Sequence, residues 1–240
     1  MMKLFMKLVL SVALLLSGSA FAGEAEDLKA LKDALVAQLP AAKNAVIKPT
    51  PVAGLYEVSD GGQVMYMTKD PRYMINGDLF DLKTRKNLTE TARGGERTRE
   101  LNKLGESNML VYKPKGETKH TITVFTDIYC PYCRKMHAEM DGYLAAGIKV
   151  RYLFLPFKGE KSFEDSVSVW CAKDRNKAMD KAKAGETIEA KTCVNPIAQQ
   201  QAVGMKLGIN GTPAIILEDG ELLPGYVPAD KLAAQLNAVK

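Results

Sequence analysis

HTITVFTDIYCPYC, residues 120–133, is the stretch that decides the fold of this chain. Its first seven residues, His120–Thr126, are rich in β-branched and aromatic side chains and predict a short β-strand. Residues 134–146 predict a helix, so the two cysteines stand where a strand gives way to a helix N-terminus. Pro131 suits the first turn of that helix, because its missing N–H costs nothing there.

The two cysteines of this stretch predict a redox-active pair. A disulfide is attacked by a thiolate rather than a thiol, so the attacking cysteine must lose its proton near neutral pH. The N–H groups and the positive dipole end at a helix N-terminus favour a thiolate at Cys130. Cys133 lies one turn deeper and is more shielded. We therefore expect Cys130 to be the nucleophile and Cys133 the resolving thiol, with Pro131-Tyr132 as the dipeptide between them.

Zinc binding is the weakest alternative for this motif. One C-x-x-C is half of a zinc ribbon, but zinc needs two more ligands at suitable spacing, and Cys171 and Cys193 form no second C-x-x-C. His137 lies two helical turns from Cys130, about 10 Å, which is too far for a Cys–His dyad. His137 and His120 are both interpreted as structural or solvent-facing, and we expect neither a metal nor a cofactor.

The N-terminus predicts export. Lys3 and Lys7 precede an apolar run over residues 8–16, and Ala20-Phe21-Ala22 fits a signal-peptidase site. The run is too short to span a bilayer, which takes about 20 apolar residues. Residues 1–22 are therefore predicted to be a signal peptide that is cleaved after Ala22, which places the mature protein in an oxidising compartment.

Four cysteines in an exported chain suggest disulfides, and three pairings are possible. Cys130 and Cys133 act together, which leaves Cys171 with Cys193 as a structural disulfide. Gly211-Thr212-Pro213 precedes a predicted strand and is a candidate cis peptide bond. An ordinary trans turn is the alternative, but its place downstream of a C-x-x-C strand and helix favours cis, with Thr212 beside the sulfurs and ready to pair with a substrate peptide.

The remaining pattern predicts two domains. Residues 23–83 predict a small α+β domain. Its expected elements are an amphipathic helix over 24–39, a loop around Pro49 and Pro51, and strands over 52–58, 63–68 and 72–82. The edge strand of its sheet could pair with the same strand of a second copy of the chain, and the alternative is that charged side chains on that strand prevent such pairing. Residues 84–107 are polar and predict a partly helical linker, broken or hinged at Gly94-Gly95 because two glycines weaken a helix interior.

Residues 108–240 predict an α/β domain of the thioredoxin fold with an inserted helical region. A strand over 148–155, helices over 164–184 and 196–207, a hairpin of strands 214–217 and 221–223, and a helix over 229–239 follow the opening strand and helix. Positive and negative residues are interspersed along the chain, whereas nucleic-acid binding needs clustered basic residues, so no nucleic-acid partner is expected.

With these features the chain resembles the DsbC-type periplasmic disulfide isomerases, with DsbG as a nearby relative. The resemblance is strongest from Met109 onward, and the matching stretches are Thr123–Ile128 leading into Cys130, Trp170–Asp174, Gly211–Ala214 and Leu223–Tyr226. It implies a cystatin-like N-terminal dimerisation domain, a V-shaped homodimer and a periplasmic location. It also implies Cys130 and Cys133 as the active pair, a structural Cys171–Cys193 bond and a cis Pro213, with a membrane reductase of the DsbD type that keeps the active pair reduced.

Two features differ from the family pattern. The family usually has Gly-Tyr between the active cysteines, whereas this chain has Pro131-Tyr132, and that dipeptide helps to set the redox poise. The linker is also longer than usual and carries Gly94-Gly95.

Together these features predict a disulfide isomerase and reductase that rearranges wrong disulfides in misfolded exported proteins through a Cys130 mixed disulfide, and that also acts as a chaperone. The alternatives are a DsbG-like reductase of sulfenylated cysteines, a net dithiol oxidase, and a chaperone without redox work.

Overall fold

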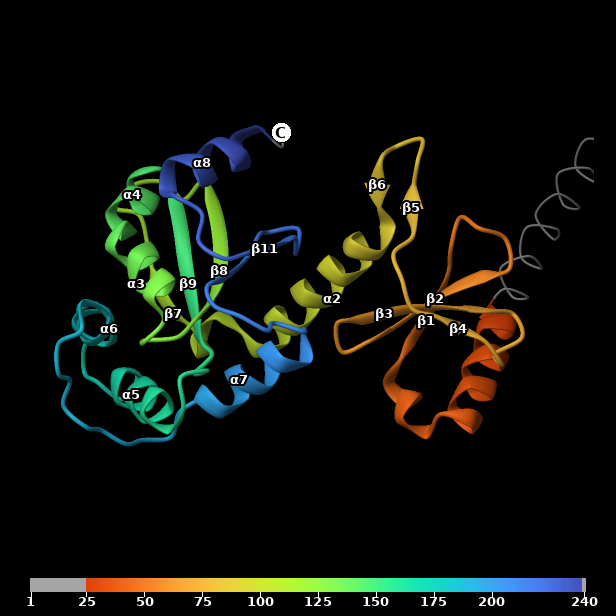
Figure 1. The fold of residues 1–240 in the computed structure, drawn as a ribbon, viewed down its shortest axis with the longest axis horizontal. Helices are drawn as coiled ribbons and strands as arrows, with labels where there is room; N and C mark the ends of the chain where they lie inside the picture. Colours follow the sequence, from red (N-terminus) through yellow and green to blue (C-terminus); the bar gives the residue numbers. More distant parts are fainter. Residues whose placement is uncertain (1–24, 239–240) are drawn as a thin grey trace, which may run out of the picture. The chain divides into compact units, whose positions relative to one another are not determined.

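The computed structural model describes residues 25–238, so the predicted signal peptide with its cleavage site after Ala22 lies outside the described residues. The described chain forms two compact units (Figure 1). The N-terminal unit runs to Asp60 and includes Val64–Asp78, and the C-terminal unit comprises Gly61–Gln63 and the chain from Leu79 onward. Each unit has its own hydrophobic core.

The N-terminal unit is one helix packed on a small sheet. Residues 25–38 are helical, and the helix places Leu31 and Leu35 against Val58 and Met67 of the sheet. A short 3-10 helix, η1, then leads into four strands in the order β1-β2-β3-β4. The bounds are η1 Pro40–Asn44, β1 Val46–Pro49, β2 Leu55–Asp60, β3 Gln63–Thr68 and β4 Met74–Ile75.

Two expectations for this part of the chain are wrong. Pro49 is expected in a loop, but it is the last residue of strand β1. The strand tolerates a proline because β1 lies at the edge of its sheet. The single strand expected over residues 72–82 is two short strands, β4 and β5 (Phe80–Asp81), in different sheets. Strand β5 pairs with β6 (Lys86–Asn87) in a small hairpin that belongs to the C-terminal unit.

The C-terminal unit is built on a five-stranded sheet in the order β11-β10-β8-β9-β7. Strands β8 and β9 run parallel, and the outer strands pair antiparallel. Strand β7 is an addition to the elements expected from the sequence. The bounds are β7 Leu110–Tyr112, β8 His120–Thr126, β9 Ile148–Phe154, β10 Ala214–Ile216 and β11 Leu222–Pro224.

Helices cover both faces of this sheet (Figure 1). Successive residues of a strand point to opposite faces, so each strand contributes to two hydrophobic cores. Val124 joins the larger core, with residues of α3, α4, α6 and α8, whereas Phe125 joins a second core, with residues of α2 and α7. The helices are α2 Leu88–Leu104, α3 Pro131–Ala138, α4 Met140–Ala145, α5 Glu160–Trp170, α6 Arg175–Ala184, α7 Ile197–Lys206 and α8 Ala229–Ala238, and the 3-10 helix η2 is Glu106–Asn108.

The expected break at Gly94-Gly95 is also wrong, because helix α2 is continuous through both glycines. The Asn87 side chain caps its start by accepting a hydrogen bond from the Glu90 N–H. Gly94 packs against the turn at Gly220, and a Cβ on Gly220 would lie 2.0 Å from the Gly94 carbonyl oxygen. The glycine at 94 therefore serves close tertiary packing, which outweighs its poor helix propensity.

Two long helices expected from the sequence are each divided. The helix expected over 134–146 splits into α3 and α4 at Glu139, whose carboxylate accepts hydrogen bonds from Ala229 N–H and from the Tyr226 hydroxyl. The helix expected over 164–184 splits into α5 and α6, and Asp174 caps the start of α6. No helix among residues 25–238 is both long and apolar enough to cross a lipid bilayer.

Candidate functional site

The Cys130 thiol lies at the end of strand β8, where helix α3 begins. Cys130 is the N-cap residue of α3 and has extended backbone angles, and Pro131 opens the helix. The Cys130 side chain is largely buried, and its Sγ donates a hydrogen bond to the Thr212 carbonyl oxygen over 3.1 Å. The nucleophile expected from the sequence is therefore placed at a helix N-terminus and beside the segment that carries Pro213.

The surroundings of Cys130 favour its ionised form. Burial alone would raise the pKa of the Cys130 thiol. Hydrogen bonds from the backbone of Cys133, from the Thr212 side chain and from the Cys133 side chain outweigh burial and lower the pKa of Cys130 below its ordinary value. Because the thiolate is the attacking species, Cys130 has the properties of the nucleophile.

The Cys133 thiol has the opposite character. It is 1% exposed, and burial raises the pKa of Cys133 above its ordinary value. The charge of Lys183 and a hydrogen bond from the Thr126 side chain act against burial without overcoming it. The two sulfurs thus differ in both access and acidity, as a nucleophile and a resolving thiol require.

Thr212 and Pro213 lie beside the cysteine pair. The Thr212–Pro213 peptide bond is cis. The Pro213 carbonyl oxygen accepts a hydrogen bond from Gly225 N–H, and Ala214 starts strand β10 next to β8. Thr212 is partly exposed, so an incoming peptide chain can reach it.

Tyr132 and Phe157 present apolar surface near the motif. Tyr132 is 63% exposed and Phe157 is 45% exposed. The Phe157 N–H is tied to the site, because it donates to the carboxylate of Asp127 over 2.7 Å. Both rings can contact an apolar side chain of a substrate.

Both histidines are buried in the fold. His120 pairs with Asn237 over 3.1 Å, and His137 contacts the hydroxyl of Tyr152 and the carboxylate of Asp180. Burial lowers the pKa of His137. Within residues 25–238, no group of three or more His, Cys, Asp or Glu residues is arranged to hold a metal ion.

A buried lysine lies beneath the cysteine motif and was missed by the sequence analysis. Lys183 of helix α6 is 4% exposed, and its Nζ donates to the Thr126 hydroxyl over 2.7 Å and to the Asp127 carbonyl oxygen over 2.8 Å. One signal could have found it: Met179, Ala182 and Lys183 are spaced three and four apart, so the lysine falls on the buried stripe of its helix.

The Asp127 carboxylate is fully buried and is held by the backbone. Its two oxygens accept hydrogen bonds from the N–H groups of Tyr129, Phe157 and Lys158. These bonds tie the chain that follows β9 to the turn that carries the cysteines. They explain how a buried charge is tolerated beside the thiols.

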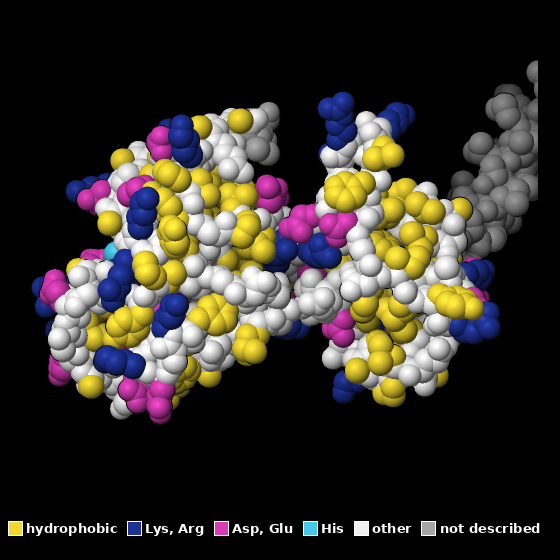
Figure 2. Space-filling view, viewed as in Figure 1, with side chains coloured by type: hydrophobic (Ala, Val, Ile, Leu, Met, Phe, Trp, Pro, Cys, Tyr) yellow, Lys and Arg dark blue, Asp and Glu magenta, His cyan; other side chains and the backbone are white. Residues whose placement is uncertain are grey.

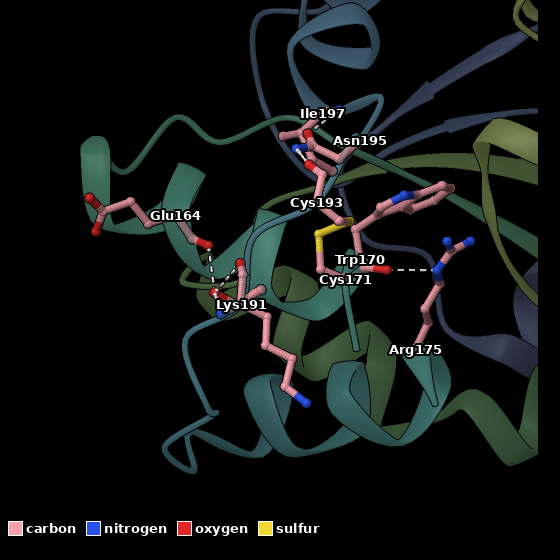
Figure 3. Close-up of a disulfide and its surroundings, with 9 residues drawn as sticks. Glu164, Trp170, Cys171, Arg175, Lys191, Cys193, Asn195 and Ile197 are labelled. Atoms are coloured by element: carbon pink, nitrogen blue, oxygen red, sulfur yellow. Dashed lines mark hydrogen bonds between the residues drawn. A yellow bond between two sulfur atoms is a disulfide. The ribbon is translucent and has the colours of Figure 1, made fainter. Parts of the chain in front are cut away.

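A disulfide between Cys171 and Cys193 ties the helical insertion together (Figure 3). Cys171 ends helix α5, and Cys193 lies in the segment before α7. The neighbouring Trp170 carries the Arg175 guanidinium 3.8 Å above its ring, and Arg175 Nε donates to the Trp170 carbonyl oxygen over 2.7 Å. The bond therefore closes the loop that contains α6 and Lys183.

Replacing Cys171 and Cys193 together by serine is expected to lower the free energy of unfolding by about 3 kcal/mol, from the loop entropy of a 22-residue separation. Urea unfolding followed by circular dichroism measures the change. Because both cysteines are replaced, neither is left as an unpaired thiol that could react with Cys130 or Cys133. An unchanged midpoint would show that the bond adds no stability.

Family models match most of the chain. A model described as the disulfide bond isomerase protein N-terminal domain matches residues 18–90, and a thioredoxin-like domain model matches residues 107–240. The thiol:disulfide interchange protein DsbC of Escherichia coli strain K12 is 41% identical over 197 residues, which cover 81% of this chain and 82% of the relative. The DsbC of Salmonella typhimurium is 43% identical over 193 residues, with 80% of each chain covered.

A solved structure shares the fold of part of the chain. A mutant of ScsC from Proteus mirabilis with a deletion in its linker aligns with a TM-score of 0.52 and 22% identity, over 64% of this chain and 88% of that one. This similarity supports the thioredoxin fold of the C-terminal unit.

Proposed function

Because this chain belongs to the DsbC family of thiol:disulfide interchange proteins, we propose that it rearranges wrong disulfides in exported proteins through a mixed disulfide at Cys130. The observation that carries the proposal is the asymmetry of the two thiols. The pKa of Cys130 is lowered at a helix N-terminus, and the pKa of the more buried Cys133 is raised. Cys130 is therefore more readily ionised and can attack, while Cys133 stays protonated until the mixed disulfide has formed.

The isomerisation steps need no net oxidation. The Cys130 thiolate attacks one sulfur of a substrate disulfide, so that a Cys130–substrate bond forms and the other substrate sulfur leaves as a thiolate. That thiolate attacks a different disulfide within the substrate. A substrate thiolate finally displaces Cys130, which leaves as the thiolate with which it began.

When rearrangement stalls, Cys133 releases the substrate. The Cys133 thiolate attacks Cys130 Sγ, the Cys130–Cys133 bond forms, and the substrate sulfur leaves with the electron pair of the broken bond. The substrate is reduced and the active pair is oxidised. A membrane reductase of the DsbD type is the proposed source of the two electrons that restore the dithiol.

Thr212 and the exposed rings form the proposed substrate surface. The Thr212 carbonyl oxygen is 3.1 Å from Cys130 Sγ, so an extended peptide that pairs with Thr212 brings its own cysteine to the nucleophile. Tyr132 and Phe157 supply apolar contacts beside it. Such a surface suits unfolded chains, which fits the proposed chaperone role.

The test is an assay with a scrambled multi-disulfide protein in a defined glutathione buffer. A catalytic amount of the mature protein should restore the native disulfides faster than the buffer alone. Recovery at the rate of the buffer would overturn the proposed isomerisation. The assay needs the mature protein from residue 23 onward, because we propose export to the periplasm with cleavage after Ala22.

Net oxidation is a second candidate function. Stabilising the Cys130 thiolate stabilises the reduced pair, which makes the disulfide form more oxidising. Pro131 occupies the dipeptide that helps to set this balance. A redox potential close to that of strong oxidants would favour the oxidase over the isomerase.

We also propose that the protein forms a homodimer through its N-terminal unit. Strand β4 is the outer strand of the four-stranded sheet, and it exposes Met74 (38%) and Ile75 (49%), next to Tyr73 (60%). Figure 2 shows hydrophobic side chains gathered over this unit. An outer strand with apolar side chains favours pairing with a second copy of the same strand.

Replacing Ile75 by lysine is expected to shift the protein from dimer to monomer, because a charge at the apolar edge opposes strand pairing. Sedimentation velocity at micromolar concentration measures the shift. The matched control is Lys48→Glu on β1, the outer strand at the other side of the sheet, which should leave the dimer intact. A variant at Ile75 that stays dimeric would place the interface elsewhere.

A further inference from the structure

Lys183 is a buried cation that the exchange steps above do not use. It comes from the helical insertion, yet its amino group reaches the floor of the cysteine site. A lysine is almost never buried without a partner, since removing its charge from water is costly. The partners of Lys183 here are a threonine hydroxyl and a backbone carbonyl oxygen, both neutral.

The Thr126 hydroxyl connects this lysine to the resolving thiol. Thr126 is 1% exposed, accepts a hydrogen bond from Lys183 Nζ over 2.7 Å, and hydrogen-bonds through its side chain to Cys133. A hydroxyl has one proton to donate. Since the Thr126 oxygen accepts from Lys183, its proton is directed to Cys133 Sγ. The three groups thus form a chain of hydrogen bonds shielded from solvent.

Cys133 needs such a partner. It can attack Cys130 only as a thiolate, but burial raises the pKa of its thiol, and the Lys183 charge is the largest influence that acts against this. With Cys133 1% exposed, water can do little to stabilise a negative charge on its sulfur.

We propose that the Lys183 ammonium, acting through the Thr126 hydroxyl, stabilises the Cys133 thiolate while it releases substrate from Cys130. This inference rests on the proposed exchange mechanism and assigns a positioning residue to its second half. In the resting state Cys133 is a thiol and Lys183 is an ammonium. When Cys133 loses its proton, the Thr126 hydroxyl donates to its sulfur while the Thr126 oxygen accepts from Lys183 Nζ, so the positive charge of Lys183 opposes the new negative charge.

The release step then balances. The Cys133 thiolate attacks Cys130 Sγ, the Cys130–Cys133 bond forms, and the bond between Cys130 and the substrate breaks. The substrate leaves as a thiolate and takes up a proton, so each release moves one proton from Cys133 to the substrate sulfur. Lys183 keeps its own proton throughout.

The charges around Lys183 keep it protonated near neutral pH in spite of its burial. Burial lowers the pKa of Lys183 to about 8. The thiols of Cys133 and Cys130 and the carboxylate of Asp127 act to raise this pKa, while Arg134 acts to lower it. The Tyr152 ring of β9 lies 6.0 Å from Nζ, and Lys183 in turn acts to lower the pKa of His137 on α3. With a pKa of about 8, most of Lys183 is an ammonium at pH 7.

The test follows both halves of the exchange in one reaction. The reduced mature protein is mixed with an aromatic disulfide that releases one coloured thiolate when Cys130 attacks and a second when Cys133 resolves the mixed disulfide. In Lys183→Met the first phase should keep nearly its normal rate, while the second slows by about tenfold or more at pH 7, and its pH midpoint moves upward. A lysine with a purely structural role would not move that midpoint.

Three further variants make the test specific. Thr126→Val removes the hydroxyl at nearly constant shape and should slow the second phase, whereas Thr126→Ser keeps the hydroxyl and should restore it. Lys181→Met removes an exposed charge from the same helix and should change neither phase. Circular dichroism confirms that each variant is folded.

The outcomes separate the inference from the proposed function. A second phase with unchanged rate and midpoint in both Lys183→Met and Thr126→Val would overturn the role of Lys183 while leaving the exchange mechanism intact. A slow second phase in Lys183→Met alone would overturn the role of the Thr126 hydroxyl. If the wild-type protein shows no first phase, the proposed function itself fails.

Discussion

Cys130→Ser is expected to reduce disulfide exchange to the rate of the redox buffer, a loss of more than about a hundredfold, because a serine hydroxyl is a weak nucleophile at neutral pH. Cys133→Ser should behave differently. Its Cys130 still attacks, but the mixed disulfide has no resolving thiol and accumulates. Non-reducing electrophoresis with a scrambled substrate distinguishes the two variants, since only Cys133→Ser should trap a covalent complex.

The same reaction predicts a pH dependence. The rate of attack follows the fraction of Cys130 that is ionised, so it is full above the Cys130 pKa and falls as pH drops through it. Because the structure lowers this pKa below the ordinary thiol value, attack persists at a pH where a free cysteine is protonated. Alkylation of Cys130 in a Cys133→Ser background measures the midpoint.

Two results would contradict this assignment. Full unscrambling activity in Cys130→Ser would remove Cys130 from the mechanism. An alkylation midpoint at or above that of a free thiol would show that hydrogen bonding at the N-terminus of α3 does not activate Cys130.

Gly220→Ala is expected to destabilise the C-terminal unit by roughly 3 to 5 kcal/mol. Gly220 has φ +87°, a conformation that a residue with a Cβ adopts at a cost, and its Cβ would lie 2.0 Å from the Gly94 carbonyl oxygen. Neither backbone segment can retreat easily, because Arg97 of α2 donates to the Gly220 carbonyl oxygen over 3.0 Å. Thermal and urea unfolding measure the loss.

Gly95→Ala is the matched control. Gly95 lies next to Gly94 in helix α2, is exposed, and has nothing within 4 Å of the position that a Cβ would take. Alanine there should stabilise the protein by about 0.5 to 1 kcal/mol through its better helix propensity. If the two variants change stability equally, the close packing of α2 on the Gly220 turn is not important.

Much of the C-terminal fold is predictable because its signals are local. The β-branched and aromatic run of His120–Thr126 forms β8, the following proline opens α3, and the hairpin of β10 and β11 falls where turn residues indicate it. The family resemblance is also shown, by relatives above 40% identity.

Two of the errors have a common cause. Helix α2 crosses Gly94-Gly95, and one expected long helix divides at Glu139. At both places the chain meets distant segments: the Gly220 turn for α2, and Ala229 and Tyr226 for Glu139. Local propensity is a weak influence beside such tertiary contacts. The division after Trp170 is local, since Asp174 caps the start of α6.

By itself, the sequence predicted the chemistry of this protein: a cysteine pair at the junction of a strand and a helix, with its order of nucleophile and resolving thiol proposed from the helix dipole and from the deeper position of Cys133. The tertiary structure alone decided what surrounds that pair. It brings the Thr212 carbonyl oxygen to Cys130 and the Lys183 amine to the Thr126 hydroxyl, from segments more than 50 residues away. The reason is that a dipole acts along one helix, whereas burial and hydrogen bonds between distant segments exist only once the chain has folded.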